Sequence, residues 1–90
     1  MRNLADGRGN IVFNLEFKPL NGWFIGYRAA GKSEHGYKYS VVQHTGSYGG
    51  TEGKYEFAGY DSDGEMVHNS VTGWLTLEEA TNMAENWKGK

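Results

Sequence analysis

The amino-acid sequence predicts a small α+β domain in which an antiparallel β-meander of four to five strands packs on one C-terminal α-helix. Apolar side chains fall on every second position through most of the chain, which is the period of a half-buried strand. After residue 76 they fall on every third or fourth position, directly behind a helix-start pattern. We expect one domain over residues 1–90, with a flexible lead-in at 1–10, the sheet at 11–73 and the helix at 76–88.

The first two predicted strands, 11–17 and 23–29, form a hairpin. Asn21-Gly22 is typical of a two-residue turn, but that turn would scatter the apolar residues over both faces of the hairpin. A five-residue loop at 18–22 instead keeps the odd-numbered apolar residues on one face, and a buried face sets the register. This loop also keeps Pro19 out of a strand, where its missing N–H would be a disadvantage.

The third predicted strand covers residues 37–44, after a small polar loop at 30–36. Pairing Ala29 with Tyr37 keeps the odd-numbered face apolar across all three strands, so two independent registers agree. A connection at 46–53 follows, with glycine at four of its eight positions. Because glycine loses much conformational freedom on ordering, we expect this connection to be mobile.

The fourth strand is predicted at 54–60 and the fifth at 65–71, separated by a tight turn at 61–64. Thr76 is a good N-cap for the helix, and Glu79 completes a capping box three residues later. The predicted core stripe of the helix consists of Leu77, Ala80, Met83, Ala84 and Trp87.

Composition limits the means of stabilisation and hints at a polarised surface. The chain has 90 residues, a net charge of −2 and no cysteine, so it has neither disulfides nor a thiolate metal site. Thirteen aromatic residues supply burial, since each large ring hides about 150–250 Å². Residues 1–45 carry a charge balance of +3 and residues 46–90 one of −5. This asymmetry marks a polarised surface unless the two halves interleave in space.

The sequence predicts a cytoplasmic protein that does not enter a membrane. No apolar run approaches the roughly 18–20 residues of a membrane span. The first ten residues are polar, with no apolar stretch behind their positive charges, so they do not form a secretory signal. The absence of cysteine also fits a reducing compartment.

One pattern match suggests nucleotide binding. Residues 26–33 fit the phosphate-binding loop pattern G-x4-G-K-S in full. That chemistry needs a helix directly after the loop, whose N-terminus cradles the phosphates. Here the loop runs instead into the predicted strand at 37–44, so we interpret the match as coincidental and expect no bound cofactor.

The sequence predicts neither a metal site nor catalytic residues. Asp61-Ser62-Asp63-Gly64-Glu65 resembles the start of a calcium loop, but the glycine and acidic positions further on do not match. The histidines His35, His44 and His68 lack the short paired spacing of zinc ligands. There is no cysteine and no G-x-S-x-G elbow for a nucleophile, and nothing in the spacing favours His44 with Ser47. We therefore expect a protein that is not an enzyme.

Nucleic-acid binding is the alternative. Residues 53–60 resemble the second RNA-contact motif of the RNA-recognition fold, in which alternating aromatic residues follow a basic one. The match is partial, and that fold needs a helix between its first two strands. Aromatic residues on an open sheet face can still stack the bases of single-stranded nucleic acid. The basic residues expected to contact its phosphates are Arg28, Lys32, Lys38 and Lys54.

The leading hypothesis is protein binding. A single helix can cover only one face of the predicted sheet, so the other face should expose apolar residues among charges. Exposed apolar patches with polar rims mark interaction sites. An acidic cluster with aromatic neighbours can engage a basic groove on a partner, such as one that normally holds nucleic acid. The expected partner-binding residues are Tyr48, Glu52, Glu56, Tyr60, Asp61, Asp63 and Glu65. Homodimerisation through the uncovered face is a further alternative.

In size, lack of cysteine, richness in glycine and aromatic residues, and absence of catalytic motifs, the chain resembles the small accessory proteins of bacteriophages. These include inhibitors of host defence such as anti-CRISPR proteins. The resemblance is one of general character across the whole chain, and it assigns a role to no residue. It implies a phage-type inhibitor that blocks a host defence protein by covering its surface, in the cytoplasm of the host cell.

Overall fold

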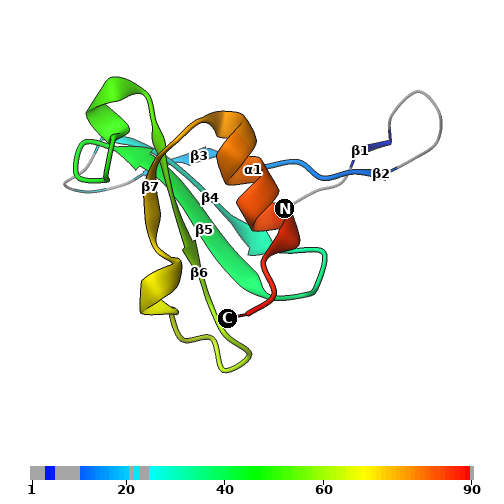
Figure 1. The fold of residues 1–90 in the computed structure, drawn as a ribbon. Helices are drawn as coiled ribbons and strands as arrows, with labels where there is room; N and C mark the ends of the chain where they lie inside the picture. The colour runs from blue at the N-terminus through cyan, green and yellow to red at the C-terminus, as the bar shows by residue number, and fades with distance from the viewer. Residues whose placement is uncertain (1–3, 6–10, 21, 23–24, 90) are drawn as a thin grey trace.

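The structure, a computed structural model, describes residues 4–5, 11–20, 22 and 25–89. A five-stranded antiparallel sheet in the order β3-β4-β5-β6-β7 packs on one α-helix, α1, which confirms the predicted fold class (Figure 1). The elements of this domain are β3 (Lys18–Pro19), β4 (Gly26–Lys32), β5 (Lys38–His44), β6 (Tyr55–Gly59), β7 (Thr72–Leu75) and α1 (Leu77–Asn86). No described helix is long and apolar enough to cross a membrane.

A separate two-stranded sheet pairs β1 (Leu4–Ala5) with β2 (Ile11–Val12). Apart from β1, the predicted flexible lead-in at 1–10 lies outside the described residues. The predicted strand 11–17 is therefore wrong in two ways: it ends at residue 12, and it pairs with β1 and not with the predicted strand 23–29. Its odd-numbered residues nevertheless face the core, because Phe13 is buried and Leu15 and Phe17 pack against the core cluster.

The helix prediction is confirmed in its start and in most of its packing. The Thr76 hydroxyl accepts a hydrogen bond from Glu79 N, and the Glu79 carboxylate accepts one from Thr76 N, so the capping box is complete. Ala80 and Ala84 are fully buried, and their small side chains let α1 approach the sheet closely. Leu77 departs from the predicted stripe, since 49% of it is exposed.

Trp87, directly after α1, closes the core over β6. Its ring packs edge-on against Phe57, with centroids 5.8 Å apart. Its Nε1 donates a hydrogen bond to Tyr60 O at 2.8 Å. A Cβ at Gly59 would overlap the Trp87 ring, so only glycine fits beneath it. Trp87 is thus fixed by both apolar and polar contacts.

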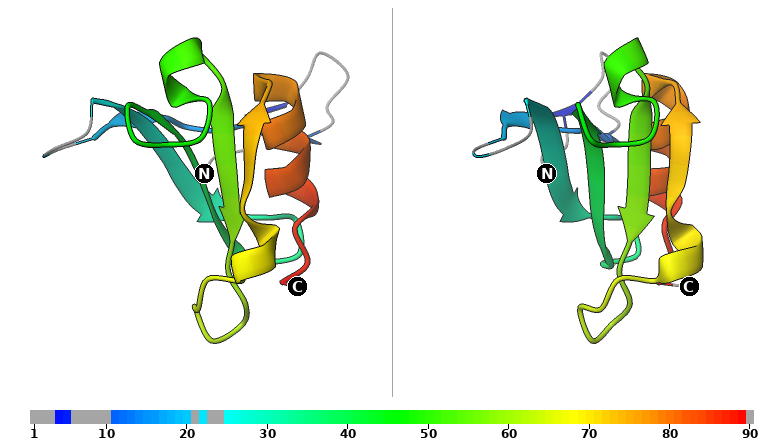
Figure 2. Two further views of the ribbon diagram at one scale, coloured as in Figure 1. Left: turned by 60° about the vertical axis from the view of Figure 1, so that its left-hand side comes forward. Right: turned by 90° about the vertical axis from the view of Figure 1, so that its left-hand side faces the viewer.

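In the middle of the sheet the odd-numbered strand residues point toward α1, as the sequence predicts, whereas Ile25 and Tyr27 at the start of the second predicted strand are exposed. Ala29, Tyr39, Val41 and Phe57 are all buried on that side. No helix or strand of the described chain covers the opposite face (Figure 2). The domain therefore has one packed face and one open face.

Both predicted hairpin registers are wrong. Odd-numbered residues nevertheless pair with odd-numbered residues, as the prediction requires. In the first hairpin, Lys18 pairs with Arg28 and Pro19 with Tyr27. Pro19 is tolerated there because β3 is an edge strand, where a missing N–H breaks no ladder bond. The backbone N–H of Leu20 donates to Gly26 O across the connecting loop. Trp23 and Phe24, which the prediction placed in the second strand, lie outside the described residues.

The second hairpin is tighter than the predicted loop at 30–36. Lys32 pairs with Lys38, so that Ala29 lies opposite Val41 and not Tyr37. The Ser33 hydroxyl explains the short turn: it accepts hydrogen bonds from His35 N and Tyr37 N and donates one to Trp87 O. The segment that fits the phosphate-loop pattern, residues 26–33, thus lies mostly in β4.

The predicted fifth strand at 65–71 is also wrong. Tyr60 makes an isolated bridge with Met66, and a 3-10 helix, η2 (His68–Ser70), precedes β7. The Ser70 hydroxyl donates to Val67 O and accepts from Gly59 N, which replaces the ladder bonds of a regular strand. The tight turn at 61–64 is confirmed, because Asp61 Oδ1 accepts hydrogen bonds from Asp63 N and Glu65 N.

Replacing the buried Tyr39 by phenylalanine tests the core. Its hydroxyl has no hydrogen-bond partner among the described residues. Burial, with the Glu16 carboxylate as the smaller cause, raises the pKa of Tyr39 from 10.0 to about 12. We expect the free energy of unfolding of Tyr39→Phe at pH 7 to be unchanged or about 1 kcal/mol higher, because an unsatisfied buried hydroxyl is removed.

The pH dependence supplies the control. An unfolded tyrosine ionises near pH 10, whereas folded Tyr39 keeps its proton to about pH 12. Stability should therefore fall between those values, by about 1 kcal/mol at pH 11 relative to Tyr39→Phe. Urea denaturation followed by tryptophan fluorescence at pH 7 and pH 11 measures both effects. A Tyr39→Phe variant that is clearly less stable at pH 7 would contradict this expectation.

Removing the helix cap should destabilise the whole domain. Thr76→Ala should lower the free energy of unfolding by about 1 kcal/mol, because Glu79 N loses its acceptor. Thr81→Ala, the matched control inside α1, should be neutral or slightly stabilising, since alanine has the higher helix propensity. Thermal denaturation followed by circular dichroism compares the two, and equal losses would argue against the capping box.

Candidate functional site

The predicted partner-binding residues divide between the two ends of β6. Tyr48, Glu52 and Glu56 lie at one end, and Tyr60, Asp61, Asp63 and Glu65 lie at the other. The five residues of β6 separate the groups by roughly 16 Å. The sequence therefore predicts the acidic character of this region but not its division into two surfaces.

The first group is organised by the glycine-rich connection 46–53, which contains the 3-10 helix η1 (Gly50–Glu52). The Ser47 hydroxyl accepts a hydrogen bond from His44 N and donates one to His44 O, both at 3.0 Å. Gly49 O accepts from Lys54 N at 2.9 Å. These bonds define the conformation of the loop that carries Tyr48. They also show that Ser47 and His44 shape the backbone here.

Tyr48 is the exposed tip of this loop, with 64% of its surface accessible. Glu56 Oε1 accepts a hydrogen bond from Tyr48 N at 3.3 Å, which ties the loop to β6. A Cβ at Gly73 would overlap the Cβ of Tyr48, so the loop lies directly against β7. Glycine at residue 73 is thus what allows this close approach.

Trp74 is the functional candidate that the sequence analysis misses. It has φ 60°, and it is the only described non-glycine residue with positive φ. The irregularity in the β6–β7 ladder, between the pairs Tyr55–Leu75 and Phe57–Thr72, is the local cause. Trp74 N donates to Tyr48 O, and 55% of the residue is exposed. The only hint in the sequence that Trp74 is unusual is its position after Gly73 and just before the helix cap Thr76.

Tyr48 and Trp74 are both exposed and are joined through their backbones, and we call the surface that they form the Tyr48–Trp74 patch. Leu77, which begins α1 three residues after Trp74, is also exposed. Carboxylates flank the patch: Glu52 in η1, Glu56 in β6, and Glu78 and Glu79 in the first turn of α1.

Lys54 is the basic residue among these carboxylates. Hydrogen bonds from the Thr76 backbone and side chain, with a smaller contribution from Lys54, lower the pKa of Glu79. Glu79 thus stays ionised at the edge of the patch. The patch combines exposed aromatic rings with a net negative surrounding.

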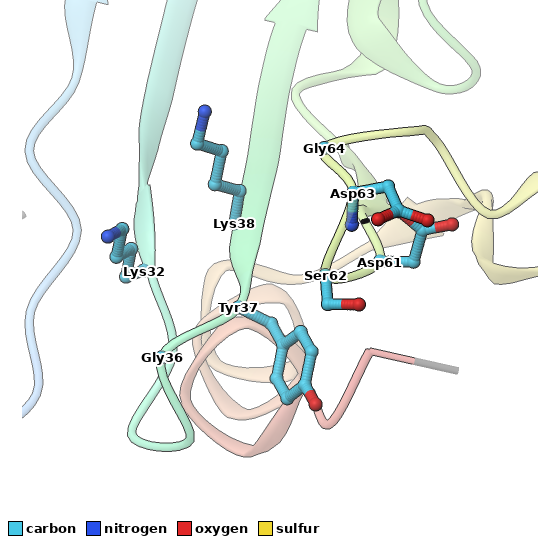
Figure 3. A pocket seen from close by; sticks show the side chains of 8 residues that line it. All are labelled: Lys32, Gly36, Tyr37, Lys38, Asp61, Ser62, Asp63 and Gly64. Carbon is cyan, nitrogen blue, oxygen red and sulfur yellow. Dashed lines mark hydrogen bonds between the residues drawn. The ribbon is translucent and has the colours of Figure 1, made fainter.

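Two residues of the second group, Asp61 and Asp63, line a charged cleft at the opposite end of β6 (Figure 3), whereas Tyr60 and Glu65 do not line it. The cleft has a volume of about 360 Å³, with Lys32 and Lys38 on one side and Asp61 and Asp63 on the other. The Asp61 carboxylate is engaged by the turn through its bonds from Asp63 N and Glu65 N. The cleft carries charges of both signs, and one of its carboxylates already accepts hydrogen bonds within the turn. It therefore favours a partner of one charge less clearly than the patch does.

The Glu85 carboxyl, near the end of α1, has a shifted pKa. Glu34 N donates to Glu85 O at 2.9 Å, which brings the turn after β4 against the end of α1. Partial burial, followed by the neighbouring Glu34 carboxyl, raises the pKa of Glu85. Neither residue lines the cleft in Figure 3. Among the described residues, no three His, Cys, Asp or Glu side chains converge as a metal site would require.

Comparisons with known proteins do not add a family to these observations. No protein-family model matches the chain, and neither curated proteins nor solved structures give a match. The functional argument therefore depends on the exposed side chains, their backbone conformation and the charges around them.

Proposed function

We propose that this chain is a non-enzymatic protein-binding module that acts by covering a partner's surface, with the Tyr48–Trp74 patch at the centre of the interface. The observation that carries the proposal is the exposed Trp74 in a left-handed backbone conformation. For a residue other than glycine that conformation costs roughly 1–2 kcal/mol, and the domain recovers little of it, since 55% of the residue is exposed. Strained residues that are exposed in this way concentrate at functional sites.

The composition of the patch supports a protein partner. Tryptophan and tyrosine dominate the few residues that carry most of the energy in protein interfaces. The Tyr48 loop and the Trp74 backbone are held by hydrogen bonds and by the close contact at Gly73, so little ordering is needed on binding. A preorganised aromatic pair with a polar rim has the features of an interface centre.

The charges around the patch favour a basic partner surface. Glu52, Glu78 and Glu79 are exposed, and they lie in η1 and in the first turn of α1, the elements that follow Tyr48 and Trp74 along the chain. Arginine and lysine side chains bind well over the face of tryptophan, and their approach is steered by nearby carboxylates. A groove that normally holds nucleic acid has this chemistry. The resemblance to phage inhibitors adds the finer proposal that the partner is a host defence protein, met in the cytoplasm of the host cell.

Substituting Trp74 separates binding from folding. Trp74→Gly should weaken partner binding at least about 30-fold, the loss typical of an interface hot spot. The free energy of unfolding should change by less than about 1 kcal/mol, because glycine adopts the left-handed conformation without strain and offsets the lost ring contacts. The tagged protein captures partners from a nuclease-treated bacterial lysate that carries nucleic-acid-based defence systems. Titration calorimetry with the captured protein then compares the variants.

Met66→Ala is the control, since Met66 is an exposed apolar residue at the opposite end of β6. A captured protein that is lost with Trp74→Gly and retained with Met66→Ala supports the proposal. Equal retention of every captured protein by the folded Trp74→Gly variant would refute it.

Charge reversal tests the basic character of the partner. Glu52→Lys should slow association several-fold at low salt, and the difference should shrink as salt screens the charges. Asp63→Lys makes the same change in net charge at the far end of β6, where a smaller effect is expected. Stopped-flow association rates over a salt series measure both variants. If neither charge reversal changes the association rate, the proposal of a basic partner surface is wrong. The role of Trp74 is then tested by Trp74→Gly alone.

A further inference from the structure

The open face of the sheet carries an unusual arrangement of basic residues. Strand residues alternate between faces. Because Ala29, Tyr39 and Val41 belong to the core, the even-numbered residues of β4 and β5 face away from α1. On β4 these are Arg28, Ala30 and Lys32, all exposed. Two lysines on the neighbouring strands, Lys18 and Lys38, are also exposed. We call the four cations Lys18, Arg28, Lys32 and Lys38 the basic stripe.

The register sets like charges directly against one another. Lys18 pairs with Arg28 across β3 and β4, and Lys32 pairs with Lys38 across β4 and β5. Like charges at directly opposed positions destabilise a sheet. A bound anion would relieve the repulsion within these two pairs.

A hollow of about 460 Å³ lies within the stripe. Arg28, Lys32 and Lys38 line it, with the small residues Ala30 and Gly31 beneath and the half-buried Tyr60 at its side. The small residues make room for a ligand between the cations. The tyrosine adds a ring on which a planar group can stack.

We propose that the basic stripe binds the phosphate backbone of single-stranded nucleic acid, with Tyr60 beside a base. Arg28 and Lys32 are four residues apart on one strand, which spaces their backbone positions by roughly 13 Å. A row of this length suits an extended polyanion better than one small anion. Cations that follow a backbone, beside an aromatic ring that accepts any base, are the combination found in single-strand binding surfaces.

The acidic turn limits the path of the strand. Asp61 and Asp63 lie across the charged cleft from Lys32 and Lys38, and Figure 3 shows the lysine side chains directed away from them. The nucleic acid should therefore follow β3, β4 and β5 and leave the sheet before the turn. This surface shares no residue with the Tyr48–Trp74 patch, so the two proposals stand or fall separately.

Fluorescence anisotropy of a labelled 15-nucleotide oligothymidylate, titrated with the full chain from 20 to 200 mM salt, tests the proposal. Four phosphate contacts on a single strand predict a slope of about −3 in a plot of log affinity against log salt. Lys32→Gln with Lys38→Gln should weaken binding at least about tenfold at low salt and reduce the slope by about 1.4. Tyr60→Leu should weaken binding at least about fivefold and leave the slope unchanged.

The matched control neutralises two lysines at the end of the chain, Lys88→Gln with Lys90→Gln. It changes the net charge equally and should leave affinity and slope as in the unmodified chain. Absence of binding at 20 mM salt would overturn the proposal, and so would an equal loss in the control, since binding would then follow net charge alone.

Two further measurements separate other occupants of the stripe. If poly-L-glutamate binds through Lys32 and Lys38 and the oligonucleotide does not, an acidic protein is the ligand and the nucleic-acid proposal is wrong. If sedimentation equilibrium at low salt shows self-association that Lys32→Gln with Lys38→Gln abolishes, a second copy of the chain occupies the stripe, which overturns it equally. A monomer that binds the oligonucleotide through these residues supports the proposal.

Discussion

The packing of α1 against β5 and β6 is the contact on which the rest of the structure depends. A helix of ten residues is only marginally stable in isolation, because the unfavourable free energy of nucleation offsets most of the stabilisation from its hydrogen bonds. Here the capping box satisfies the first turn, and Ala80 and Ala84 are buried without any exposed surface. Trp87 then covers Phe57 and binds Tyr60 O, so the end of the chain is fixed to the middle of the sheet.

That single helix also divides the sheet into a packed side and an open side. The side of the sheet that faces α1 holds the buried side chains of Tyr39, Val41 and Phe57. The open side carries cations because no described element covers it and water solvates them. A small domain with one covering helix therefore presents a sheet face and two strand ends to its surroundings, and both proposed binding surfaces lie there.

The β6–β7 irregularity links the core to the proposed interface. Leu75 is buried beside Tyr55, and Thr72 pairs with Phe57, so one extra residue must be accommodated between them. The chain does this by turning Trp74 into the left-handed region and outward, next to Tyr48. The position of the exposed ring is thus a consequence of how the ladder is anchored on both sides. Burial of Leu75 and exposure of Trp74 are two results of the same backbone constraint.

By itself the sequence determined the strand period, the apolar odd-numbered face, the capping box and the tight turn at Asp61, because each depends on residues close together along the chain. The strand registers were decided by tertiary contacts, above all by Ser33, whose hydroxyl links the second hairpin to Trp87 O. The same holds for the exposure of Trp74 and for the opposed lysines Lys32 and Lys38. These features depend on which distant backbone lies alongside, and a local pattern carries no information about that choice.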